Sequence, residues 1–189
     1  MDWHVRQMME VLRGVCKDVG GELYDSPSLN TSDQVESNSP GWHATLSGRE
    51  VNVVLYDVPG ARDHFSIIMN AWPRITLSLR REERFDWLKK SMGKLQDVQV
   101  GNADFDRDFL IGGRPEGDVK QFLARREVQD WVKTLGDFHH LAGDQGFFRA
   151  TFPLTPKTRY EPEDLRVRVV SMLRLAEAVE KVGLEAPRM

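Results

Sequence analysis

The sequence predicts an α+β domain in which an antiparallel β-meander and a hairpin pack with N- and C-terminal helices. Strand-like segments follow one another through short turns, and the helical patterns gather towards the two ends. The strict alternation of strands and helices that a doubly wound fold needs is absent. With 189 residues, 40% of them hydrophobic, the chain can bury one sizeable core, so we expect a single domain over 1–189.

The N-terminal segment, residues 2–19, has the pattern of an amphipathic helix. Its apolar residues recur at helical spacing, and Gly20-Gly21 supplies a stop signal. The following stretch, residues 25–41, is rich in Ser, Asn, Asp and Pro. It has little to bury, so we expect an exposed, mobile loop there.

The segment "WHATLSGREVNVVLY" predicts a β-hairpin that turns at Ser47-Gly48. This turn places Ala44 opposite Val51 and Trp42 opposite Val53. One face then carries the apolar set Trp42, Ala44, Leu46, Val51, Val53 and Leu55, and the other carries His43, Thr45 and Asn52.

Two more strands are expected to complete a meander of about four strands, because alternation continues after the hairpin. The remaining elements are expected in this order: strands within 64–72 and 74–82, a short helix at 84–93, one broken helix or two within 117–136, a second hairpin within 137–154, and a helix that opens at Pro162.

Composition excludes several classes of function. The net charge is -3, with 26 basic and 29 acidic residues, whereas nucleic-acid binders usually carry a basic excess. Cys16 is the single cysteine, so neither an internal disulfide nor a thiolate zinc site is expected. No nucleotide, cofactor or zinc-protease motif occurs, and no apolar run reaches the ~20 residues of a membrane span. We therefore expect a cytoplasmic protein with no cofactor, no metal, no membrane and no nucleic-acid partner.

The most unusual stretch is "VQVGNADFDRDFLIGG", which has three alternating aspartates. Asp104, Asp106 and Asp108 match positions 1, 3 and 5 of an EF-hand calcium loop. Position 6 is Phe109 where glycine is needed, and position 12 is Pro115 where glutamate is needed. The pattern therefore does not predict an EF-hand.

A structural interpretation accounts for the same residues. Asn102 can cap a helical turn that places Phe105 and Phe109 on one buried side, after which the chain extends as a strand up to Gly112-Gly113. The carboxylates then cap and solvate the turn, and Asp106 or Asp108 can pair with neighbouring arginines, Arg107 or Arg114. The alternative is an acidic site for a metal or small ligand at Asp104, Asp106 and Asp108.

This stretch resembles a motif, roughly D-[IV]-Q-x-G-[DN]-x-x-F-D-R-x-F-x-[IV], of an uncharacterised bacterial protein family. The resemblance is specific over about 15 residues and implies no activity. Asparagine at 102 departs from the more usual aspartate. The match is carried by Asp97, Gln99, Gly101, Asn102, Phe105, Asp106, Arg107, Phe109 and Ile111.

His139-His140 and the flanking Asp137 and Asp144 form a second candidate cluster. Adjacent strand residues point to opposite faces, so the two histidines are not expected to share a metal. We expect one to face solvent and the other to pack at the sheet edge.

A partner surface is suggested by a sheet face that should be polar but is partly apolar. The terminal helices are the first candidates to cover it, and a protein partner is the alternative. Its members are His43, Val54, Tyr56 and Ile68.

Two functions follow from these observations. The first is a non-catalytic protein-binding or adaptor domain, whose order of elements resembles that of secretion-chaperone-like domains; a homo-oligomer is one form of it. The second is a small-ligand or metal-dependent enzyme that uses the three aspartates, with Arg107 and Arg114 in support.

Overall fold

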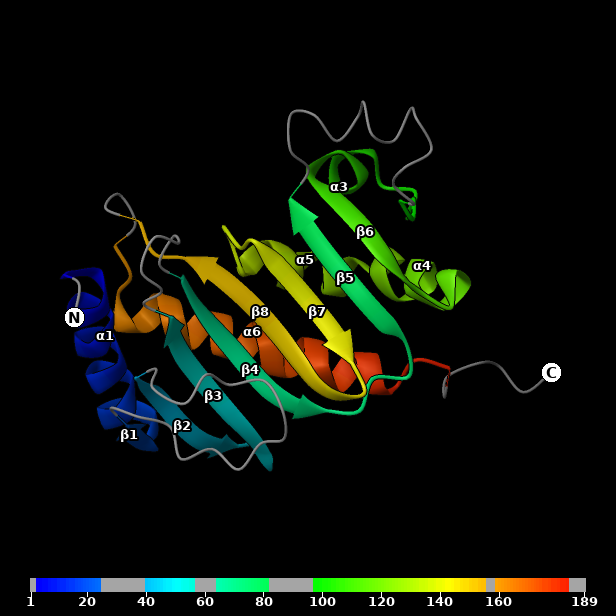
Figure 1. Ribbon diagram of the computed structural model, residues 1–189. Coiled ribbons are helices and arrows are strands. Elements are labelled where there is room, and N and C mark those ends of the chain that lie inside the picture. The colour runs from blue at the N-terminus through cyan, green and yellow to red at the C-terminus, as the bar shows by residue number, and fades with distance from the viewer. Residues whose placement is uncertain (1–2, 25–39, 57–63, 82–96, 156–158, 184–189) are drawn as a thin grey trace.

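A computed structural model describes residues 3–24, 40–56, 64–81, 97–155 and 159–183 (Figure 1). The loop predicted at 25–41 lies outside these residues up to position 39, and the short helix predicted at 84–93 lies outside them entirely.

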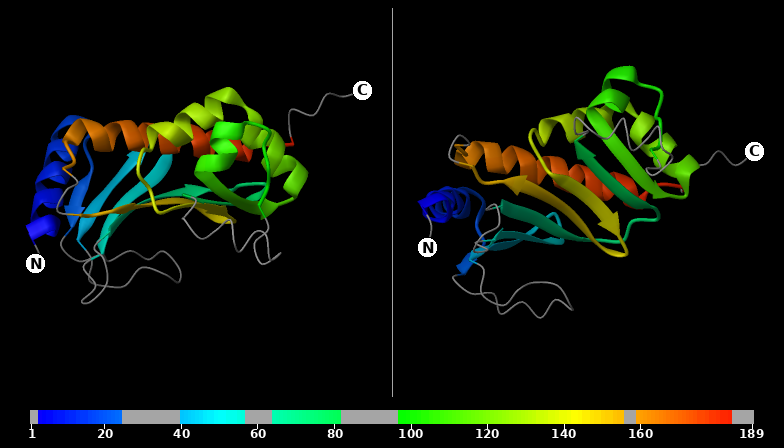
Figure 2. Two further views of the ribbon diagram at one scale, coloured as in Figure 1. Left: turned by 90° about the horizontal axis from the view of Figure 1, so that it is seen from above. Right: turned by 45° about the horizontal axis from the view of Figure 1, so that its top comes forward.

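The protein has two layers, an antiparallel sheet and a set of helices on one side of it (Figures 1 and 2). This architecture confirms the predicted α+β class. The strands are β1 (Glu22–Tyr24), β2 (Gly41–Leu46), β3 (Arg49–Tyr56), β4 (His64–Ala71), β5 (Thr76–Arg81), β6 (Phe109–Arg114), β7 (His140–Asp144) and β8 (Gly146–Pro153). The helices are α1 (Trp3–Val19), α3 (Ala103–Asp108), α4 (Glu116–Ala124), α5 (Arg126–Thr134) and α6 (Pro162–Glu180).

The first hairpin has the predicted turn and register. Ala44 pairs with Val51 and Trp42 with Val53. Ser47 and Gly48 have φ angles of 52° and 75°, and positive φ at both central residues is what a type I′ hairpin turn requires.

The strand order differs from a continuous four-strand meander. The observed order is β1-β2-β3-β4-β8-β7-β5-β6, so the second hairpin separates β4 from β5. β4 pairs with β8 over its whole length, from His64 opposite Pro153 to Ala71 opposite Gly146. Neighbouring strands lie about 4.8 Å apart, and two strands, β8 and β7, separate β4 from β5. The link between Ala71 and Thr76 is long enough to cross the end of this hairpin when it is nearly extended.

The helices bury the apolar face of the sheet. α6 packs against β4, α1 and α5, and α4 packs against β6. α6 starts at Pro162 as predicted, with a capping box between Glu161 and Asp164. Its buried side includes Met172 and Leu175, whereas Leu173 is only partly buried.

In the part of the chain that the structure describes, no helix combines the length and apolar character needed to cross a bilayer.

Candidate functional site

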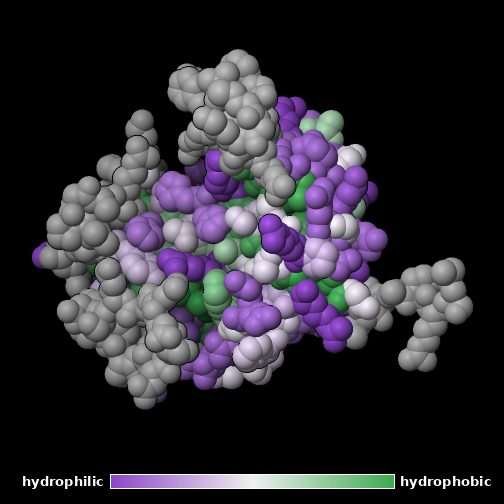
Figure 3. All heavy atoms as spheres, turned by 45° about the vertical axis from the view of Figure 1, so that its right-hand side comes forward, coloured by the Kyte–Doolittle hydropathy of each residue, from purple (hydrophilic) through white to green (hydrophobic). Residues whose placement is uncertain are grey.

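The sheet has one face that none of the described helices covers, which we call the open face (Figure 2). Residues on this face alternate with the core residues, because neighbouring strand positions point to opposite sides. One cross-strand row runs through the whole sheet: Glu22, His43, Asn52, Ile68, Arg149, Ala142, Ser78 and Gly112. In the oblique view of Figure 3, hydrophobic residues form separate green patches between hydrophilic purple ones.

The four residues predicted as a partner surface all belong to the open face. The expectation that the terminal helices cover them is wrong, because α1 and α6 contact the other side of the sheet. Val54 and Tyr56 are nevertheless buried, at 0% and 7% exposure, although neither belongs to the helix-covered core. His43 and Ile68 are half-buried.

Buried polar atoms without partners occur on this face. The hydroxyls of Tyr24 and Tyr56 and the side-chain oxygen of Asn52 are buried and have no hydrogen-bond partner within the described residues. Burial, and after it the electrostatic effect of the nearby Tyr56, raises the pKa of Tyr24 to about 12. Tyr24 lies close over Gly41, where an added Cβ would come within 2.6 Å of its hydroxyl. Such atoms usually find a protein, water or ligand partner.

Arg149 lies at the centre of the open face. Its Nε donates a hydrogen bond to Ser66 Oγ at 3.1 Å, and Ser66 Oγ lies 3.0 Å from Thr151 Oγ1. The guanidinium lies over the Tyr56 ring at 5.5 Å, and that ring stacks on His64 at 4.6 Å. Within the described residues no carboxylate pairs with Arg149.

His140 also lies on this face and not at the sheet edge, where we expected one of the two histidines. β7 is flanked by β8 and β5, and both His139 and His140 are exposed. His140 Nε2 and Ser78 Oγ are 2.9 Å apart. His140 keeps an exposed part, but partial burial of its ring, followed by the charges of Arg149 and Arg80, lowers its pKa. The flanking acids interact elsewhere and not with His140. Asp137 pairs with Arg81, and Asp144 accepts the N–H of Gln145.

A groove of about 550 Å³ crosses β7, β5 and β6 beside this pair. Small residues, among them Ser78, Ala142 and Gly112, form part of its lining, with Phe147 and Arg114 also lining it. An added Cβ at Gly112 would meet nothing nearer than 3.9 Å. The groove can therefore take a side chain or a small molecule.

The aspartate stretch has the local structure that the structural interpretation predicted. Asn102 Oδ1 accepts the N–H of Phe105 at the start of α3, and its Nδ2 donates to the buried Gln129. Phe105 and Phe109 are buried with ring centroids 4.7 Å apart, and Phe109 stacks on Phe138. β6 starts at once at Phe109.

The three aspartates do not converge on a shared cleft. Asp104 and Asp108 pair with Arg107 on the surface, at 3.0 and 3.3 Å. Asp106 instead accepts the N–H groups of Val100 and Gly101 at 2.8 and 2.9 Å. A shallow depression lies beside α3 and is lined by Gln99, Gly101, Ala103, Asp106 and Arg107, so Asp106 is the only one of the three aspartates that lines it. Within the described residues, no group of three His, Cys, Asp or Glu is placed to hold a metal ion.

Arg149, Ser66, Thr151 and His140 were not singled out as one site from the sequence. The alternation of "FFRATFP" assigns Arg149 and Thr151 to the same face of β8. It gives no indication that β8 lies beside β4, and this pairing is what brings Ser66 to them.

No protein-family model matches the chain, and no curated protein matches it. Among solved structures, the crystal structure of the mycobacterial trehalose monomycolate transport factor A, TtfA, is similar. The TM-score is 0.62 at 9% sequence identity, over 97% of this chain and 99% of that one. At this identity the likeness shows a shared fold.

Proposed function

We propose that this chain is a non-catalytic protein-binding or adaptor domain that meets its partner through the open face. The observation that carries the proposal is a sheet face that carries partly apolar residues and that no described helix covers. Two of its residues are accessible enough for contact, Phe147 at 37% exposure and the half-buried Ile68. Aromatic and aliphatic side chains of this kind are common anchors in protein interfaces.

The neighbouring groups suit a protein partner as well. Arg149 and Arg80 add positive charge beside apolar positions, and a mixed surface of this kind is typical of non-obligate interfaces. The fold similarity to a transport factor is compatible with a role that does not depend on catalysis. A location in the cytoplasm is part of the proposal, and cell fractionation tests it.

The test compares two variants of the open face with one of the helix layer. Ile68→Gln and Phe147→Asp alter the open face, and Val170→Asp alters an exposed apolar residue of α6 with 45% exposure. We expect affinity capture from the native lysate to recover the same protein with the wild type and with Val170→Asp, and to lose it with both open-face variants. Capture that survives both open-face variants would refute the proposal.

A second copy of this chain is one candidate partner. Sedimentation velocity on the purified protein separates this case from a different protein partner. A concentration-dependent dimer that Ile68→Gln dissociates and Val170→Asp leaves intact would assign the open face to self-association.

A further inference from the structure

We propose that the open face holds an oxyanion site, in which Arg149 and Tyr56 bind the carboxylate or phosphate group of a small ligand. The site stands independently of the protein-binding role.

Arg149 is held in place, and no carboxylate of the described residues pairs with its guanidinium. The Nε bond to Ser66, itself bonded to Thr151, fixes the plane of the guanidinium. Its contact with the Tyr56 ring fixes it from one side. These contacts leave the two terminal nitrogens without an acceptor in the described part of the chain. A guanidinium in this state presents a fork of donors that matches carboxylate and phosphate oxygens.

Tyr56 supplies the second, independent observation. It is 7% exposed, and its hydroxyl has no partner in the described part of the chain. The hydroxyl belongs to the ring over which the guanidinium lies, so both groups fall within the span of one small ligand. The neutral phenol can donate a hydrogen bond to an anion, and a buried hydroxyl that has no hydrogen-bond partner is energetically unfavourable.

The surroundings favour an anion and not a cation. The positive charges of Arg149 and Arg80 lie close enough to His140 to lower its pKa, in addition to the effect of burial. The local charge around Arg149 is therefore positive. Among the described residues, no Asp or Glu forms a salt bridge with Arg149. The stacked His64 and Tyr56 rings give the remainder of a ligand a flat surface.

The experiment is an NMR titration of the full chain with inorganic phosphate and, separately, with acetate, against sodium chloride at equal ionic strength. We expect saturable shifts of amides in β3, β4 and β8 near positions 56, 66 and 149. Saturation by phosphate alone assigns a phosphate ligand, and saturation by acetate alone assigns a carboxylate. Arg149→Gln should weaken the binding at least about tenfold, whereas Arg174→Gln on α6 should leave it unchanged.

Tyr56→Phe keeps the ring and removes only the hydroxyl, so it separates folding from binding. We expect it to keep or raise the melting temperature and to weaken anion binding several-fold. Shifts that do not saturate, that sodium chloride reproduces, or that persist in Arg149→Gln would overturn the site. Full anion affinity in Tyr56→Phe would overturn the role of the hydroxyl.

Discussion

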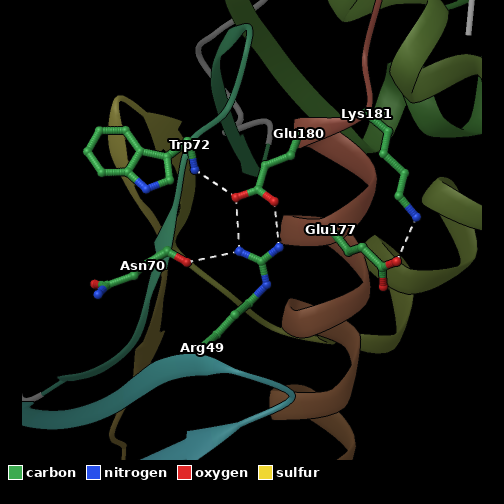
Figure 4. A network of polar contacts seen from close by, with 6 residues as sticks. All are labelled: Arg49, Asn70, Trp72, Glu177, Glu180 and Lys181. Carbon is green, nitrogen blue, oxygen red and sulfur yellow. Dashed lines mark hydrogen bonds and ion pairs between the residues drawn. The ribbon is translucent and has the colours of Figure 1, made fainter. Parts of the chain in front are cut away.

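Arg49 and Glu180 are 131 positions apart, and they join the first hairpin to the end of α6 through two hydrogen bonds (Figure 4). Arg49 Nη1 also donates to the carbonyl of Asn70, and Glu180 accepts the backbone N–H of Trp72 at 2.8 Å. Both side chains are largely buried, at 20% and 24% exposure. The pair therefore holds three elements together where β4 ends, and the Trp72 indole points away from α6.

Glu180→Gln should destabilise the protein by about 2 kcal/mol, because the charged hydrogen bonds to Arg49 are weakened. Chemical denaturation measures the change. Glu177→Gln is the matched control, since Glu177 is exposed and pairs with Lys181, the residue that directly follows α6. Equal effects of the two substitutions would refute the role of the Arg49 pair.

The same pair predicts a pH dependence. The hydrogen bond from Arg49, and then that from Trp72, lower the pKa of Glu180 below its ordinary value of 4.5, against the opposing effect of burial. The unfolded chain then binds the proton more readily, so the stabilisation is present above about pH 4.5 and is lost as the pH falls through the lowered pKa. Denaturation midpoints between pH 3 and 7 should fall less steeply in Glu180→Gln than in the wild type.

Asp106→Asn tests the two interpretations of the aspartate stretch. Asparagine keeps one acceptor oxygen and turns an amide group towards the other backbone N–H, so we expect a loss of about 1–2 kcal/mol. Asp104→Asn, which removes only a surface pair with Arg107, should cost less than about 0.5 kcal/mol. Calcium or magnesium binding that the wild type shows and Asp106→Asn abolishes, with stability unchanged, would favour the acidic site instead.

Two buried tyrosines should respond differently to loss of the hydroxyl. Tyr160 donates to the carbonyl of Pro153 at 3.0 Å, so Tyr160→Phe should cost about 1 kcal/mol. The hydroxyl of Tyr56 is buried without a partner among the described residues, so Tyr56→Phe should be neutral or stabilising. Thermal denaturation compares the two, and a larger loss in Tyr56→Phe would show that its hydroxyl has a stabilising partner.

Substitution of two sheet glycines by alanine should change stability by different amounts. At Gly41 an added Cβ would meet the Tyr24 hydroxyl at 2.6 Å and the backbone of Val53, so Gly41→Ala should cost about 1–3 kcal/mol. At Gly112 the nearest atom would be 3.9 Å away, so Gly112→Ala should be tolerated. If both variants melt at the wild-type temperature, the close approach of Tyr24 to β2 is not rigid.

Local chemistry could be predicted from the sequence because neighbouring residues suffice to determine it. The Ser47-Gly48 turn fixes the register of the first hairpin, and Asn102 fixes the start of α3. The helical spacing of Phe105 and Phe109 likewise predicts their contact.

Contacts between distant segments were decided only by the tertiary structure. The insertion of β8 and β7 between β4 and β5 depends on which strand edge each hairpin meets, and alternation alone carries no information about that choice. The side on which the helices pack, and with it the position of Arg149 beside Ser66 and Tyr56, follows from the same choice. The sequence by itself determined most of the described elements and the turn and register of the first hairpin, but not the short strand β1. The arrangement of the open face required long-range pairing, because it joins residues that no local signal connects.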